Sequence, residues 1–158
     1  MKTLILYATK HGATHEIAER IAKKIPGAIL HNLKQSNIPS LADFGCVIIG
    51  SPVYVGSIRK EAKAFMAQNM DILKGKNLGL FLCGLQAEEE KQYFASNFPP
   101  DILTAAMSAS FLGGIFDPEK AGFMARFIMK AVAKLPGYID RIDDEKIEQF
   151  AEAMMGGV

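Results

Sequence analysis

Short apolar runs alternate with amphipathic segments along most of the chain. The runs have the length and the residue types of buried strands. They predict five strands, at 3–8, 28–33, 46–50, 78–83 and 108–112. The segments between them carry apolar residues at helical spacing. They predict one helix that ends before Pro26 and further helices at 59–69, 90–96, 117–135 and 143–155.

The regular alternation predicts an α/β fold built on a doubly wound parallel sheet. The run at 46–50 is apolar at consecutive positions, which is typical of a central strand buried on both faces. No repeat, low-complexity tract or linker divides the sequence, so we expect one domain over residues 1–158. The loops at 9–14, 51–56 and 83–90 each follow a strand, and should therefore meet at the carboxyl edge of the sheet.

Composition narrows the classes of function. Apolar residues fill 49% of the 158 positions, which suits a domain with a substantial core. The formal net charge of +1 gives no basis for nucleic-acid binding. No uncharged apolar run is long enough to cross a membrane, and the first run lacks the length and cleavage site of a signal peptide. We therefore expect a cytoplasmic protein.

The two cysteines, Cys46 and Cys83, have no CxxC spacing and fall at opposite ends of two predicted parallel strands. A strand rises roughly 3.3 Å per residue, which puts them about 13–17 Å apart. A disulfide needs Cα atoms within about 7 Å. We expect two free thiols. Cys46 should lie in the core, and Cys83 should lie near any ligand bound by the loops at the carboxyl edge.

The turn at 9–14 suits an anion. The first turn of the following helix leaves backbone N–H groups without partners, and the helix dipole adds partial positive charge there. Gly12 allows a close backbone approach, and Thr9 and Thr14 offer hydroxyl donors. Neither GxxxxGK[ST] nor GxGxxG is present. A phosphate held largely by neutral donors is the functional interpretation, and an ordinary threonine-capped turn is the alternative.

The letters T-K-H-G-A-T in this turn match the T/S-x-T/H-G-x-T loop that wraps the FMN phosphate in flavodoxin-like proteins. The sequence thus resembles that family, and the resemblance implies FMN as cofactor. It also implies a flavodoxin-like five-stranded parallel sheet of order 2-1-3-4-5, with an inserted helix after the fifth strand. The implied cofactor-binding residues are Thr9, Lys10, His11, Gly12, Ala13, Thr14, Ser51, Pro52, Val53, Tyr54, Val55, Gly56, Cys83, Gly84, Leu85 and Gln86.

In that family the second and third loops enclose the isoalloxazine ring. Tyr54 could stack on the ring, although a tyrosine that only covers the base of the loop is the alternative. The Val55–Gly56 peptide lies where family members turn a carbonyl toward flavin N5, and Gly56 can adopt the positive φ this needs. The third loop has no aromatic residue and would contact the ring edge through its backbone and Gln86. The chain has no Trp, so the Trp-over-flavin arrangement of many flavodoxins is absent.

No side chains form a nucleophile–base pair or a metal-ligand cluster, so neither a catalytic residue nor a metal site is predicted. The histidines, His11, His15 and His31, are interpreted as structural. Residues 88–90 are three glutamates. They form either a solvated helix start or a negative rim that lowers the flavin potential. The redox chemistry would belong to the flavin.

Residues 122–137 are an addition that simple flavodoxins lack. This segment is similar to the corresponding part of the menaquinone-linked protoporphyrinogen dehydrogenases, a flavodoxin-like branch that works at the membrane surface. The opening K-T-L-I-L and the loop ending at Gly56 are similar as well. The resemblance implies oxidation of protoporphyrinogen IX with a quinone acceptor. A soluble carrier between redox partner proteins is the alternative, and a flavin-free scaffold is a third.

Within this addition, Arg126, Lys130 and Lys134 recur every four residues and form one stripe of the predicted helix. The rest of residues 122–135 is mostly apolar and must be buried. It would pack on the sheet or over the flavin loops. Alternatively, it would lie in a lipid boundary, with its cations at anionic headgroups. The second interpretation predicts peripheral contact at the inner face of the membrane.

Overall fold

The computed structural model describes residues 1–117 and 138–156. The main sheet has six strands, and five of them are parallel in the order β2-β1-β3-β5-β6. The parallel strands are β1 (Thr3–Tyr7), β2 (Ile29–Asn32), β3 (Cys46–Tyr54), β5 (Asn77–Cys83) and β6 (Ala106–Phe111). Numbered along the chain, the five parallel strands have the predicted order 2-1-3-4-5, so the predicted fold class is confirmed.

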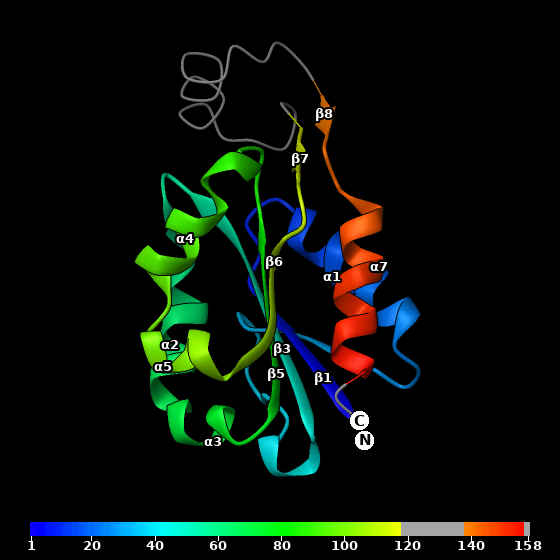
Figure 1. Ribbon diagram of the computed structural model, residues 1–158, viewed down its shortest axis with the longest axis vertical. Coiled ribbons are helices and arrows are strands. Elements are labelled where there is room, and N and C mark those ends of the chain that lie inside the picture. The colour runs from blue at the N-terminus through cyan, green and yellow to red at the C-terminus, as the bar shows by residue number, and fades with distance from the viewer. Residues whose placement is uncertain (118–137, 157–158) are drawn as a thin grey trace.

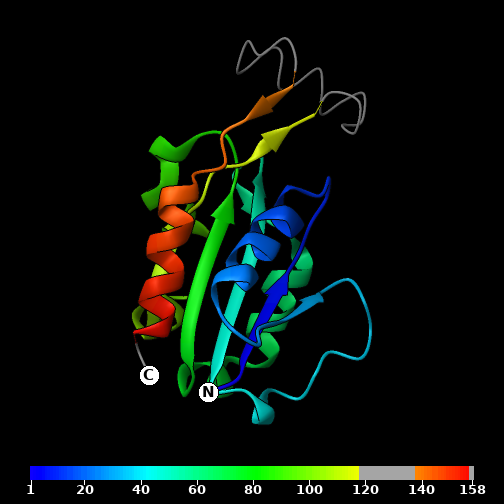
Figure 2. The same cartoon turned by 90° about the vertical axis from the view of Figure 1, so that its right-hand side faces the viewer.

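Helices cover both faces of the sheet (Figures 1 and 2). One face carries α1 (Ala13–Lys24) and α7 (Asp144–Met155). The other carries α2 (Lys60–Gln68), α3 (Met70–Lys74), α4 (Glu90–Asn97) and α5 (Pro100–Ala105). Short 3₁₀ helices lie at η1 (Leu41–Asp43) and η2 (Ala87–Glu89).

Alternate residues of the central strands face the two layers, because side chains alternate along a strand. Leu4 and Leu6 of β1 lie in the core under α2 to α5, whereas Ile5 lies in the core under α1 and α7. All three side chains are fully buried. The strands are therefore buried between two layers of helices, and the loops that follow them lie at the carboxyl edge of the sheet.

Two helical boundaries differ from the sequence-based expectation. The helix expected over 59–69 is followed directly by a second short helix, α3, after a break at Asn69. The expected turn around Pro99–Pro100 instead begins helix α5. Proline fits the first turn of a helix because the N–H it lacks would have no partner there.

The segment after Gly50 was expected to be a loop, and this expectation was wrong for most of its length. Strand β3 continues to Tyr54, pairs in parallel with β5 as far as Pro52, and then turns back into β4 (Ser57–Ile58). Beyond Gly50, the last partner of β1, β3 has a parallel neighbour on one side only. A proline without an N–H is therefore tolerated at position 52.

Beyond β6 the chain forms a small antiparallel hairpin of β7 (Ile115–Phe116) and β8 (Ile139–Asp140). Figure 2 shows this hairpin above the carboxyl edge of the sheet. The helix expected at 117–135, its basic stripe and the membrane contact of residues 122–135 lie almost entirely outside the described residues. Within the described ranges, no helix is long and apolar enough to cross a membrane.

Candidate functional site

The three predicted loops meet at the carboxyl edge of the sheet. The ammonium of Lys10, in the first loop, lies 3.9 Å from the ring centroid of Tyr54, at the end of β3. Tyr54 in turn packs in the same apolar cluster as Leu85, in the third loop, and Phe116 of β7. The convergence expected from the sequence is therefore present: Lys10 contacts Tyr54, and Tyr54 and Leu85 both pack against Phe116.

The first loop has an open, left-handed turn at its centre. Gly12 has φ +96°, and its N–H donates to Thr9 Oγ1 over 3.0 Å. The first helical hydrogen bond runs from Glu16 N to the Gly12 carbonyl, so the N–H groups at positions 13–15 precede any helical acceptor. A Cβ added at Gly12 would have no atom within 4 Å. Within the described part of the chain, the loop therefore presents free backbone donors beside open space.

Thr14 carries the second hydroxyl expected from the sequence, and this hydroxyl is buried. Its side chain is 1% exposed, and its hydroxyl has no hydrogen-bond partner of normal geometry among the described residues. The hydroxyl lies beside the thiol of Cys83 at the end of β5. Burial raises the pKa of that thiol to about 12, with a smaller lowering effect of the Thr14 hydroxyl.

Both cysteines are free, as predicted, and both are buried. Burial also raises the pKa of Cys46, at the other end of the sheet. Each thiol is therefore protonated at neutral pH and unsuited to nucleophilic chemistry.

Positive charge gathers around the first loop. Partial burial lowers the pKa of His11, and the nearby charges of Lys10 and Arg59 lower it further, so the imidazole is neutral at pH 7. Arg59 Nε lies 3.7 Å from Glu61 Oε2, and both atoms are buried without a hydrogen bond. Arg59 was not among the predicted site residues, because it follows the second loop by three positions and has no motif around it.

The second loop is a two-residue hairpin turn rather than an extended loop. Tyr54 pairs with Ser57 across it, and Val55 and Gly56 have φ of +51° and +78°. Two successive positive φ values are those of a type I′ turn, which a β-branched residue rarely adopts. Val55 is also 78% exposed. The tip is thus a strained and apolar point beside Tyr54.

Helix α4 connects the second and third loops, and no local pattern in the sequence indicates this. The side-chain amide of Asn97 donates to the Gly56 carbonyl over 2.9 Å and accepts from Ile58 N over 3.1 Å. One turn earlier, the hydroxyl of Tyr93 lies 3.0 Å from Gln86 Oε1 in the third loop.

The third loop is fixed by its neighbours. Gly84 N donates to the Gly113 carbonyl over 2.9 Å, and Arg141 Nη1 donates to the Leu85 carbonyl over 3.0 Å. Glu90 Oε1 accepts from Phe111 N over 2.9 Å, so this glutamate links α4 to the end of β6. The exposed glutamates at the site are 88 and 89.

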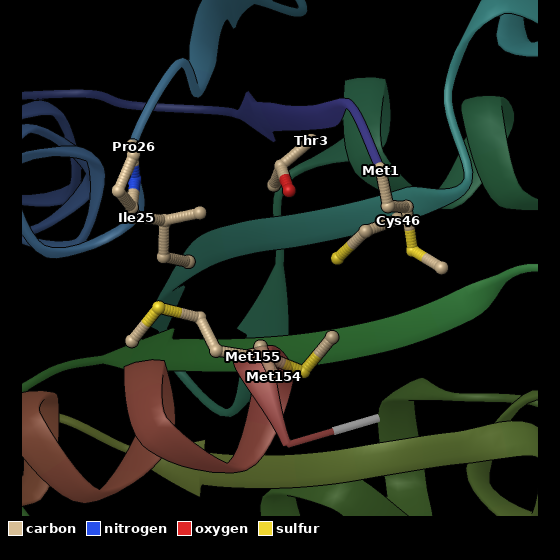
Figure 3. A pocket seen from close by; sticks show the side chains of 7 residues that line it. All are labelled: Met1, Thr3, Ile25, Pro26, Cys46, Met154 and Met155. Atoms are coloured by element: carbon tan, nitrogen blue, oxygen red, sulfur yellow. The ribbon is translucent and has the colours of Figure 1, made fainter. Parts of the chain in front are cut away.

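A cavity of about 110 Å³ lies elsewhere, at the amino end of the sheet (Figure 3). Its lining residues are Met1, Thr3, Ile25, Pro26, Cys46, Met154 and Met155. It is smaller than the roughly 300–1,000 Å³ of typical ligand pockets. Among the described residues, no group of three or more His, Cys, Asp or Glu side chains could hold a metal ion.

Comparison with known proteins identifies the family. The sequence profile described as "Flavodoxin domain" matches residues 4–142. A flavodoxin of Synechocystis sp. is 29% identical over 115 residues, covering 70% of this chain and 65% of that protein. A light-independent protochlorophyllide reductase polypeptide of Cycas taitungensis is 23% identical over 138 residues, covering 87% of this chain and 25% of that polypeptide. The chain thus spans less than two thirds of either relative.

Among solved structures, oxidised flavodoxin 2 from Bacillus cereus has a TM-score of 0.63 at 20% identity, and the match covers all of both chains. The flavodoxin of Streptococcus pneumoniae has a TM-score of 0.58 at 18% identity, again over both whole chains. At these identities the structures support the fold.

Proposed function

The chain belongs to the flavodoxin domain family, and from this premise we propose that its three converging loops bind FMN and use it for electron transfer. In flavodoxin the cofactor lies at the switch point beside the first and third strands of the sheet. FMN is accordingly the cofactor of this chain. The observation that carries the proposed site is the set of unpaired donors around Gly12.

The donors fit a phosphate. The N–H groups of Ala13, Thr14 and His15 have no helical acceptor, and the Thr14 hydroxyl is buried without a normal hydrogen bond. The helix N-terminus adds partial positive charge, Lys10 adds a full charge nearby, and Arg59 adds a charge that its ion pair with Glu61 partly offsets. The proposed phosphate site comprises Thr9, Lys10, His11, Gly12, Ala13 and Thr14. Arg59 would strengthen it through its charge.

The remaining predicted residues would hold the ring. When bound, FMN accepts and donates electrons, and the protein supplies orientation and electrostatics. Tyr54, Val55 and Gly56 would contact one side of the ring, with Ser51, Pro52 and Val53 holding that hairpin on the sheet. The third loop would contribute Cys83, Gly84, Leu85 and Gln86. Because Lys10 covers the Tyr54 ring, stacking of a flavin on that face requires the Lys10 side chain to move.

FMN should bind at least about a hundredfold more tightly than riboflavin, because the first loop would bind the phosphate that riboflavin lacks. These contacts would contribute about 2.7 kcal/mol or more to the binding free energy. Titration of the apoprotein with each flavin, followed by quenching of flavin fluorescence, measures the ratio. Inorganic phosphate should compete with FMN and leave riboflavin binding unchanged. Equal affinities for FMN and riboflavin would contradict a phosphate site in this loop.

Two uses of the bound flavin remain as proposals. In the first, the protein is an enzyme that oxidises protoporphyrinogen IX with a quinone acceptor. The support for it is the resemblance of residues 122–137 together with the hairpin that carries them, because Phe116 and Ile139 pack beside Tyr54. Peripheral membrane contact through residues 122–135 belongs to the same proposal. In the second, the protein is a soluble electron carrier between protein partners, and the flavodoxin among its relatives supports this use.

The electron donor distinguishes the two uses. In the enzyme, protoporphyrinogen IX should bleach the flavin absorbance in stopped-flow mixing, and a quinone should restore it. In the carrier, a flavodoxin reductase should reduce the flavin and the porphyrinogen should have no effect. A variant with Arg126→Glu, Lys130→Glu and Lys134→Glu should lose quinone reoxidation on anionic vesicles in the first case only.

A further inference from the structure

We propose that Asn97 is a positioning residue that holds the Val55–Gly56 turn in its strained conformation, and thereby sets the potential at which bound FMN is reduced. The inference rests on the proposed function, because it needs the flavin ring beside this turn. Nothing in the loop sequences themselves points to Asn97, which lies about forty positions further along the chain.

Both N–H groups and the oxygen of the Asn97 side-chain amide form hydrogen bonds. The side chain is 8% exposed at the end of α4. Its oxygen accepts from Ile58 N over 3.1 Å, and its nitrogen donates to the Gly56 carbonyl over 2.9 Å and to the Tyr93 carbonyl over 2.8 Å. Rotating the amide by half a turn would set its N–H groups against the Ile58 N–H, so only this orientation satisfies all three contacts.

The hairpin that Asn97 holds is weak on its own. Strand β4 is two residues long and is joined to β3 by two residue pairs. The turn above it requires Val55 at φ +51°, where a β-branched side chain is strained. Strained backbone persists only when its surroundings over-determine it. Asn97 supplies that constraint by bonding to the backbone on the β4 side of the turn.

The turn lies at the proposed flavin site. Val55 follows Tyr54 directly, and the same helix that carries Asn97 also holds Gln86 of the third loop through Tyr93. Helix α4 thus fixes the two loops that would lie on either side of the flavin ring. The oxidised and reduced forms of a flavin differ in the hydrogen bonds they offer. A turn that is free to adapt therefore stabilises one form differently from a turn that is held.

The test compares Asn97→Ala and Asn97→Asp with wild type. Alanine removes all three hydrogen bonds, whereas aspartate keeps the acceptor for Ile58 N and loses both donors. Asn69→Ala is the matched control, since that amide also donates to a backbone carbonyl, Phe65 O at 2.9 Å, but lies between α2 and α3, before the start of β5.

Two readouts are needed. Amide hydrogen exchange of the apoprotein should be at least about tenfold faster at Ile58 in Asn97→Ala and unchanged in Asn69→Ala. In the FMN-loaded protein, both Asn97 variants should shift the first one-electron equilibrium at least about tenfold, or about 59 mV. The ratio of FMN to riboflavin affinity should stay within about twofold of wild type, because the first loop is untouched.

Each outcome decides a separate point. Unchanged exchange at Ile58 would show that Asn97 does not hold the turn. Faster exchange with an unchanged potential would show that the turn does not act on the flavin. A wild type that binds no FMN would overturn the proposed function, while the exchange rates would still report on the turn. If Asn97→Ala fails to fold, Asn97→Ser replaces it, since a hydroxyl retains one donor.

Discussion

Replacing Gly12 with valine should lower the affinity for FMN at least about a hundredfold, or about 2.7 kcal/mol, and leave riboflavin affinity within about twofold. Gly12 has φ +96°, a conformation that costs an L-residue roughly 1–2 kcal/mol. The new side chain would also enter the open space beside the free N–H groups, which is where a phosphate would approach. Fluorescence titration with the two flavins measures both affinities.

Gly27→Val is the matched control. Gly27 also has a positive φ, +75°, and a Cβ there would likewise meet no atom within 4 Å, but it lies beyond the other end of α1. Both variants should lose similar free energy of unfolding, and only Gly12→Val should lose FMN. Equal loss of FMN in the two variants would mean that backbone strain, rather than the phosphate approach, explains the effect.

Gly50→Ala should lower the free energy of unfolding by about 3 kcal/mol or more, at the upper end for overpacking of a core. A Cβ at Gly50 would lie 2.0 Å from Cζ of Phe81, on the neighbouring strand β5. Phe81 is fully buried and has an edge-on contact with Phe150, so its ring has little room to retreat. Urea unfolding of the apoprotein measures the change.

A second substitution identifies the cause. Phe81→Leu removes the outer ring atoms that the new methyl group would meet, so the double variant should be more stable than the sum of the two single changes by about 1–3 kcal/mol. Gly79→Ala is the comparison within the same sheet. The closest atom to its new Cβ is the sulfur of the flexible Met154 side chain, at 2.6 Å. Its loss should be smaller, and strict additivity of Gly50→Ala with Phe81→Leu would contradict the steric explanation.

The sheet could be predicted because its determinants are local. Each central strand is a short apolar run. The helices also have local signals: Asp143 marks the start of α7, where its side chain accepts from Lys146 N. The turn before α1 is also local, because Gly12 and the helical pattern that follows it predict a strand–turn–helix unit. These elements therefore followed from the sequence.

The parts that escaped prediction depend on distant residues. Pro52 looks like a loop residue until the missing neighbour of β3 is known. The bonds of Asn97 to the second loop and of Arg141 to Leu85 join segments roughly 40 to 60 positions apart, and no periodicity or motif encodes them. The burial of the Thr14 hydroxyl has no local signal either, because it follows from the packing of α1 against β5.

The hairpin of β7 and β8 has a consequence for how this domain can diversify. Phe116 and Ile139 are paired across it, and Arg141 N is tied to the Gly114 carbonyl over 2.7 Å. The two ends of the intervening sequence are thus fixed side by side, whatever its length. Closing a longer loop between fixed ends costs only about 0.6 kcal/mol per doubling of its length. Descendants of one ancestral gene could therefore exchange this stretch freely, and acquire new electron donors without rebuilding the sheet that holds the cofactor.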